Sequence, residues 1–144
     1  MQNIKEIESE IIEEFNLLGE DWEARYEYII ELGKELPQMS ESLKTDERLI
    51  KGCQSRVWLH SELKDGKVYY TVDSDAAIPK GIVALVSRVL SGHTPDEIMA
   101  AELNFINQIG LKEHLSPTRA NGLVSMIKQM KMDAIALKEV ENKM

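Results

Sequence analysis

The sequence predicts an α+β fold, in which helices pack on one face of a small antiparallel β-sheet. Two observations carry this prediction. Near both ends of the chain, apolar residues recur every three or four positions, which is the period of an amphipathic helix. Between these ends, residues 53–73 alternate in polarity around an Asp-Gly pair, which is typical of a β-hairpin. The 144 residues suit one domain, 1–144, without repeats or a low-complexity linker.

Two helices are expected before residue 38. An apolar stripe runs from Ile4 to Leu18, and Gly19 is a natural helix stop. Asp21 can cap a second helix, which Pro37 ends. The expected inner face of this second helix comprises Trp22, Tyr26, Ile29, Ile30, Leu32 and Leu36. The two helices are expected to pack against each other as a helical hairpin.

The middle of the chain changes its period. Residues 38–52 are polar and lack a period, so we interpret them as a loop with a short extended piece at Leu49 and Ile50. Residues 53–63 then alternate as a strand. The "KDGK" that follows predicts a tight turn, and residues 67–73 form the returning strand.

The last part of the chain is expected to be helical. An apolar helix covers 78–89, and Ser74 or Asp75 can cap it. The "TPDE" at 94–97 is a capping box that opens a segment ending at Gly110. The "SPTR" at 116–119 opens the last helix in the same way. The expected core residues of that helix are Leu123, Met126, Ile127, Met130 and Ile135.

Composition excludes several classes of function. The formal net charge of −8 argues against a nucleic-acid partner, because phosphate binding needs clustered Lys and Arg. The same charge is compatible with a partner that has a basic docking surface, but acidity can also serve solubility alone. No apolar run approaches the length of a membrane span, and the acidic N-terminus does not resemble a signal or transit peptide. We therefore expect a cytoplasmic protein without a membrane partner.

No metal or other cofactor is expected. One cysteine cannot form an internal disulfide or a multi-thiolate metal site. His60, His93 and His114 lie far apart and show no ligand spacing, although a site assembled in space stays possible.

Cys53 is the first candidate functional residue. A lone cysteine is most often a small buried hydrophobe. Here, however, Gly52 permits an unusual backbone bend, and the thiol lies where a loop meets a strand. A free thiol is only partly ionised at neutral pH, so a nucleophilic role needs help. Backbone N–H groups of the loop or Arg56 could supply it.

Other polar residues have simpler interpretations. Arg119 in the first turn of the last helix can be a solvated side chain or can face an anion or thiolate. Asp73 and Asp75 could suggest acid–base work, but helix capping explains them. His60 lies too far along the strand to act as a base for Cys53, at ~3.3 Å per residue. Trp58 is expected in the core.

Four motifs give the sequence a resemblance to a known family. They are "GCQSRVW" at 52–58, "DSDAAIPKGIVALV" at 73–86, "SGHTPDEI" at 91–98 and "GLKEHLSPTRANGL" at 110–123. In this order and spacing they resemble the SufE family, the sulfur acceptors of iron–sulfur cluster assembly, over roughly residues 22–137.

The resemblance implies a fold and a role. The fold is similar to that of the U-type iron–sulfur scaffolds. In the SufE family the lone cysteine takes sulfur from the persulfide of a PLP-dependent cysteine desulfurase (SufS-like), stimulates that enzyme, and carries the sulfur to a SufBCD-like scaffold complex. Cys53 falls on that cysteine, Arg119 on the family's arginine after "SPT", and residues 73–75 on its acidic turn. The "LIKGC" run and Pro79 depart from the more usual residues of the family.

Three other functions compete with sulfur transfer. A cluster-assembly scaffold would need several cysteine ligands, which this chain lacks unless a dimer shares them. A cysteine hydrolase would need a histidine beside the thiol and an oxyanion site. A non-catalytic interaction module would keep its activity after the thiol is alkylated. A lone thiol suits a relay, because a second one nearby would resolve the persulfide into a disulfide. We expect an accessory protein rather than a stand-alone enzyme.

Overall fold

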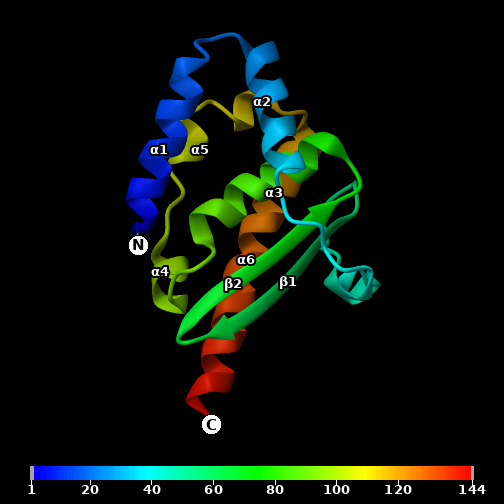
Figure 1. Cartoon of the computed structure of the whole chain (residues 1–144), viewed down its shortest axis with the longest axis vertical. Coiled ribbons are helices and arrows are strands. Elements are labelled where there is room, and N and C mark those ends of the chain that lie inside the picture. The colour runs from blue at the N-terminus through cyan, green and yellow to red at the C-terminus, as the bar shows by residue number, and fades with distance from the viewer. Residues whose placement is uncertain (1, 144) are drawn as a thin grey trace.

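The computed structural model describes residues 2–143 and shows an α+β fold, as predicted. A two-stranded antiparallel hairpin lies against the helices α3 and α6, and α1 and α2 lie beyond α3 (Figure 1). The helices are α1 (Ile4–Leu17), α2 (Trp22–Lys34), α3 (Ala77–Leu90), α4 (Pro95–Ala100), α5 (Phe105–Gln108) and α6 (Pro117–Asn142). The strands are β1 (Val57–Lys64) and β2 (Lys67–Ser74), and short 3-10 turns are η1 (Glu41–Leu43), η2 (Asp46–Arg48) and η3 (Lys112–His114). No described helix is long and apolar enough to cross a membrane.

The hairpin follows its sequence signal closely. Leu59 pairs with Val72, and both side chains face the core. Asp65 and Gly66 form the two-residue turn with φ values of 52° and 79°. Positive φ at both positions is typical of the turn that matches the natural twist of paired strands. The alternating period and the Asp-Gly pair therefore set the register together.

The first strand begins later than predicted. Residues 53–56 lie outside β1, because the chain folds back before Val57. The Ile50 amide donates to the Val57 carbonyl at 2.9 Å, and Leu49 forms an isolated bridge with Trp58. The short extended piece at Leu49 and Ile50 is thus confirmed, and the segment between it and Val57 is a closed loop.

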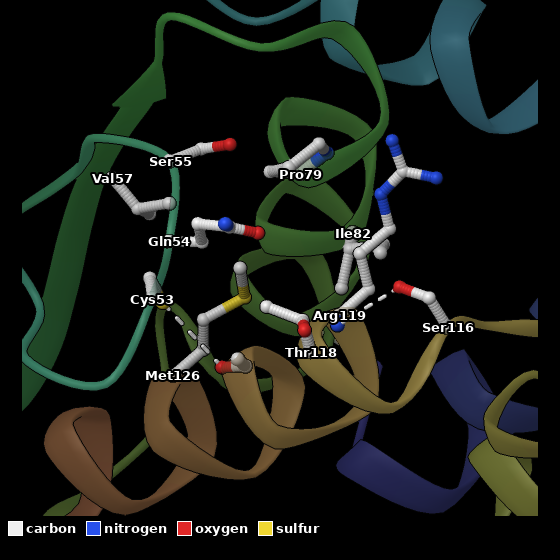
Figure 2. Close-up of a pocket in the computed structure, with 11 residues that line it drawn as sticks. Cys53, Gln54, Ser55, Val57, Pro79, Ile82, Ser116, Thr118, Arg119 and Met126 are labelled. Carbon is white, nitrogen blue, oxygen red and sulfur yellow. Dashed lines mark hydrogen bonds between the residues drawn. The ribbon is translucent and has the colours of Figure 1, made fainter.

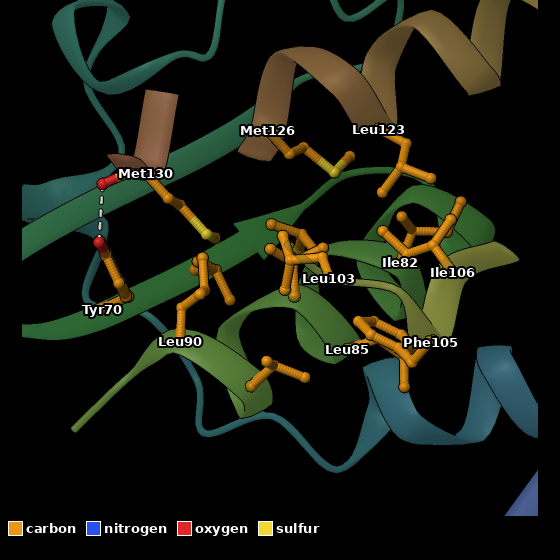
Figure 3. Packing of buried hydrophobic residues seen from close by; sticks show 14 of the residues in the cluster. Tyr70, Ile82, Leu85, Leu90, Leu103, Phe105, Ile106, Leu123, Met126 and Met130 are labelled. Carbon is orange, nitrogen blue, oxygen red and sulfur yellow. Dashed lines mark hydrogen bonds between the residues drawn. The ribbon is translucent and has the colours of Figure 1, made fainter. Parts of the chain in front are cut away.

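The hydrophobic core is centred on α3. This helix is buried over most of its surface, since the hairpin, α6, α1 and α2 all pack against it. Figure 3 shows Leu85 and Leu90 of α3 among side chains from β2, α5 and α6. The Tyr70 hydroxyl donates to the Met130 carbonyl at 2.7 Å, which joins β2 to α6 inside this core.

Most of the predicted inner face of α2 is confirmed: Ile29 is fully buried, and Trp22, Tyr26, Leu32 and Leu36 pack half-buried against the core. Ile30 lies outside the core cluster, and the unpredicted Arg25 and Gly33 are buried. Arg25 donates to the carbonyls of Gly19 at 2.8 Å and Ile109 at 2.9 Å. An arginine can therefore be buried here because two carbonyls accept its N–H groups.

The two N-terminal helices depend on α3 more than on each other. Phe15 of α1 and Tyr28 of α2 meet edge to face, with ring centroids 5.4 Å apart. The more extensive packing of each helix is nevertheless against α3. The predicted hairpin of α1 and α2 is therefore corrected: the two helices touch, but α3 supports both.

Helix capping is confirmed at three starts and wrong at one. The side chains of Asp21, Thr94 and Ser116 accept from the first-turn amides of α2, α4 and α6. The N-cap of α3 is instead Ala76, without a side-chain cap. The predicted caps Ser74 and Asp75 have other partners: the Ser74 hydroxyl donates to the Arg56 carbonyl, and Asp75 accepts from the Arg56 amide.

Two predictions about the later helices are corrected. The segment from Thr94 to Gly110 is two short helices, because Leu103 has φ 55° and breaks the helical path between α4 and α5. On α6, Leu123, Met126 and Met130 are buried as predicted. Ile135 is 42% exposed, and its neighbour Ala134, four residues after Met130, faces the core instead.

Candidate functional site

The cysteine loop, residues 49–56, rests on α6. Gly52 has φ +93°, a conformation that L side chains rarely adopt. A Cβ at Gly52 would lie 2.4 Å from the Ser125 hydroxyl oxygen, so glycine is also required for this close approach. Gly122, one turn earlier on α6, faces Cys53: a Cβ there would lie 3.5 Å from the thiol sulfur. Glycines on both surfaces therefore bring the thiol onto the helix.

A cavity of about 340 Å³ opens beside the thiol. It lies between the cysteine loop, the start of α3 and the first turns of α6 (Figure 2). Its walls mix apolar and polar side chains. The lining residues are Cys53, Gln54, Ser55, Val57, Pro79, Ile82, Ser116, Thr118, Arg119, Gly122 and Met126.

The Cys53 thiol is half-buried and neutral at rest. Its sulfur lies 3.7 Å from the Gly122 carbonyl oxygen, to which the S–H donates. Burial raises the pKa of the thiol above its ordinary value of 9.0, and no charged group acts in the other direction. The structure therefore gives no support to Arg56 as an activator of the thiolate. The backbone of Arg56 is tied to residues 74 and 75, and its side chain does not line the cavity.

Arg119 shares the cavity with Cys53 without touching it. Its amide donates to the Ser116 hydroxyl at 3.3 Å, which fixes the first turn of α6. Its side chain is exposed, and in Figure 2 the guanidinium extends past Pro79 and Ile82 rather than toward Cys53. The two predicted site residues thus come from distant parts of the sequence to line one cavity, and the Arg119 side chain lies on its exposed side.

The acidic turn supports the site from outside the cavity. Asp73 is buried and pairs with Lys44 at 3.2 Å and Lys80 at 3.3 Å. Burial alone would raise the pKa of Asp73, but the Ser74 amide and the two lysines outweigh it and hold the pKa below the ordinary range. Asp75 accepts from the Arg56 amide at 3.1 Å, which anchors the end of the cysteine loop. Neither carboxylate faces Cys53.

His60 and Trp58 have structural partners. The His60 ring accepts from Arg48 at 3.2 Å and meets Glu62 at 2.9 Å, so it lies in a separate polar group on the hairpin. Trp58 is half-buried and outside the core cluster, which corrects the prediction. The Lys44 ammonium lies 5.5 Å from the centre of its ring. The helices α3 and α6 cover one face of this hairpin, and the Trp58 side chain lies on the opposite face.

Several cavity residues were missed by the sequence analysis. Gln54 and Thr118 carry no signal of their own, and Met126 was predicted only as a core residue, because folding alone brings these three to the thiol. Gly122 could have been found, since a glycine inside a helical pattern is unfavourable unless something approaches closely.

The chemistry available at this cavity is narrow. No histidine lines it, and among residues 2–143 no group of three His, Cys, Asp or Glu side chains could hold a metal ion. What remains in the lining is one thiol, one cation, Arg119, and polar groups that can donate hydrogen bonds. Such a site can exchange sulfur once the thiol is deprotonated, but it lacks the base of a cysteine hydrolase.

Comparison with known proteins gives consistent matches. The family model "SufE: Fe-S metabolism associated domain" matches residues 9–134. An uncharacterized SufE-like protein of Rhizobium meliloti is 45% identical over 130 residues, which cover 87% of this chain and 92% of the relative. A second, from Synechocystis sp., is 43% identical over 116 residues, which cover 81% of this chain and 73% of the relative.

A solved structure shares the fold. The solution structure of a hypothetical protein from Thermus thermophilus superposes with a TM-score of 0.75 at 20% sequence identity. The superposition covers 92% of this chain and 96% of the other. At this identity the likeness concerns the fold alone.

Proposed function

The chain belongs to the SufE family of Fe–S metabolism, and we propose that its Cys53 accepts sulfur from the persulfide of a PLP-dependent cysteine desulfurase and thereby stimulates that enzyme. The observation that carries the proposal is the placement of the only thiol at a cavity without a base or metal ligands. In the same proposal the exchange takes place in the cytoplasm, and the sulfur passes on to a SufBCD-like scaffold complex.

The exchange is a thiol–persulfide substitution. The Cys53 thiolate attacks the outer sulfur of the donor persulfide, forms a new S–S bond, and displaces the donor cysteine as a thiolate. The proton lost by Cys53 balances the proton gained by the donor thiolate, and no net oxidation occurs. The cavity has no base, so the proton must leave to solvent or to a group of the docked enzyme. Delivery to the scaffold repeats the substitution, with an acceptor nucleophile attacking the outer sulfur of the Cys53 persulfide.

Arg119 has a supporting role in this proposal. Its exposed guanidinium stands at the approach to the cavity, where it can attract the anionic sulfur during the exchange. It is not close enough to change the resting thiol, whose pKa is set by burial alone. Its contribution is therefore expected only when donor and acceptor meet.

The central test replaces Cys53 with serine, which is nearly isosteric. Cys53→Ser should keep the fold and the binding of the desulfurase but abolish stimulation of sulfide release. Wild-type protein incubated with desulfurase and free cysteine should gain the mass of one or more sulfur atoms. A reductant should reverse the gain, and peptide mapping should place it on Cys53. If Cys53→Ser stimulates fully, sulfur transfer is rejected in favour of an interaction module.

Arg119 is tested with a matched cation. Arg119→Ala should slow sulfur acceptance with little change in thermal stability, since exposed ion pairs contribute only ~0–1 kcal/mol. Lys112→Ala removes another exposed positive charge, which does not line the cavity, and should not slow acceptance. Equal rates for the two variants would remove Arg119 from the mechanism.

A further inference from the structure

The sequence segments that build the thiol site carry an unusual charge. Residues 48–61 and 114–132 contain six Lys and Arg residues and no Asp or Glu, in a chain with 25 acidic residues. The first segment includes the cysteine loop, and the second the first half of α6. The two segments thus carry a charge of +6, and the rest of the chain, with 11 Lys and Arg against 25 acidic residues, carries −14.

The fold brings these two segments together. The Cys53 thiol donates to Gly122, and Gly52 lies against Ser125, so the loop is seated on the acid-free part of α6. Lys51 is two residues before Cys53, so their Cα atoms are at most about 7.6 Å apart. Lys128 is one helical turn beyond Ser125 and shares its face of α6.

Four exposed cations lie on these two segments, and we call them the basic face: Lys51, Arg56, Arg119 and Lys128. Of these, Arg119 lines the cavity beside the thiol. None of these four side chains makes a hydrogen bond or ion pair with any described residue. The lysines beside the acidic turn differ from these four cations, because Lys44 and Lys80 each form an ion pair with Asp73. Asp75, which follows β2, accepts from the backbone amide of Arg56 with its carboxylate.

We propose that the basic face docks an acidic surface on the sulfur donor, with carboxylates arranged around the donor's persulfide-bearing cysteine. The inference rests on the proposed function. The rest of this chain would repel an acidic partner, whereas the basic face attracts it. Complementary charge of this kind steers diffusional encounter and sets orientation. The thiol lies within the attracting region, so electrostatic orientation presents Cys53 first.

The binding test uses charge reversal with a matched control. Lys51→Glu/Lys128→Glu should weaken binding to the desulfurase of the same cell by about tenfold, chiefly through slower association, and should flatten its dependence on salt. Lys5→Glu/Lys112→Glu makes the same change in net charge with exposed lysines outside the basic face, and should bind nearly as wild type. At saturating concentrations the control variant should accept sulfur as completely as wild type.

A second measurement does not depend on any partner. The dianionic disulfide 5,5′-dithiobis(2-nitrobenzoate) should react with Cys53 faster, relative to neutral 2,2′-dithiodipyridine, in wild type than in Lys51→Glu/Lys128→Glu. The control double variant should keep the wild-type ratio. Equal ratios in all three proteins, or equal desulfurase affinity in the two double variants, would overturn the proposal. Failure of sulfur transfer itself appears separately, as absence of sulfur on wild-type Cys53 despite normal binding.

Discussion

The crossing of α2 with α3 and the seat of the cysteine loop on α6 both depend on glycine, but with different neighbours. At the crossing, a Cβ on Gly81 would lie 2.0 Å from the Ile29 carbonyl oxygen, and one on Gly33 would lie 2.8 Å from the Gly81 nitrogen. Backbone meets backbone there. At the loop, the atom facing Gly52 is the hydroxyl oxygen of Ser125, the end of a side chain.

This difference indicates which of the two contacts can move without disrupting the core. Neither helix backbone can move at the crossing without opening the core around α3. The cysteine loop, in contrast, is anchored at its two ends, by the buried Ile50 and by the Arg56 backbone, which bonds Ser74 and Asp75. Between these anchors the thiol bonds the Gly122 carbonyl. We therefore expect the part around Cys53 to move toward a partner more easily than either helix at the crossing. Three predictions test this comparison.

The largest effect is expected at the crossing. Gly81→Ala should destabilise the protein by about 3 kcal/mol, because a Cβ cannot fit between α2 and α3 without separating them. Urea denaturation measures the loss. The folded fraction should still accept sulfur at the normal rate.

Gly122→Ala is the matched control for this crossing variant. It also introduces alanine into a helix, where alanine is favoured over glycine by about 1 kcal/mol. Its new Cβ meets only the Cys53 sulfur, at an ordinary contact distance of 3.5 Å. If both variants lose the same stability, the crossing is no more constrained than the loop seat.

A smaller loss of stability, with a larger effect on the thiol, is expected from Gly52→Ala. The positive φ should cost about 1–2 kcal/mol, and the contact with Ser125 should push the loop off α6. Cys53 should then react several-fold faster with iodoacetamide. Gly66→Ala carries the same kind of φ strain with nothing within 4 Å, and should leave the thiol rate unchanged. Unchanged alkylation in Gly52→Ala would show that the loop does not shield Cys53.

The smallest effect on stability concerns the proton of Cys53. Burial raises its pKa above 9.0, so the native state holds this proton more tightly than the unfolded chain does. That stabilisation is present below pH 9.0 and is lost as the pH rises through the higher pKa of the folded state. Alkylation of Cys53 should accordingly rise about tenfold per pH unit and show no plateau by pH 9. A plateau near neutral pH would mean that a cation activates the resting thiol.

Local signals in the sequence predicted the local structure. The β-hairpin, its Asp-Gly turn and the caps at Asp21, Thr94 and Ser116 depend on residues within a few positions of one another. Such contacts form with the same geometry wherever the segment lies in the fold. The stripe on α6 was predicted correctly up to Met130. The next core position is Ala134, where the helical period places it, whereas Ile135 was predicted for its hydrophobic side chain.

The failures share a different cause. Arg25 is buried because the carbonyl of Ile109, far away in the sequence, accepts a hydrogen bond from its guanidinium. Trp58 is outside the core because only one face of the hairpin is covered. Ser74 and Asp75 do not cap α3, since the end of the cysteine loop occupies them. In each case a distant partner outweighed a local preference.

The sequence by itself determined the α+β class, the SufE family motifs and the single thiol at Cys53, because composition, period and short motifs are properties of neighbouring residues. Only the tertiary structure decided the state of that thiol and the charge around it. Burial against Gly122 and Met126 keeps the thiol protonated, and the docking of two acid-free segments makes a basic face on an acidic protein. Both depend on solvent exclusion and on distances through space, which folding alone sets.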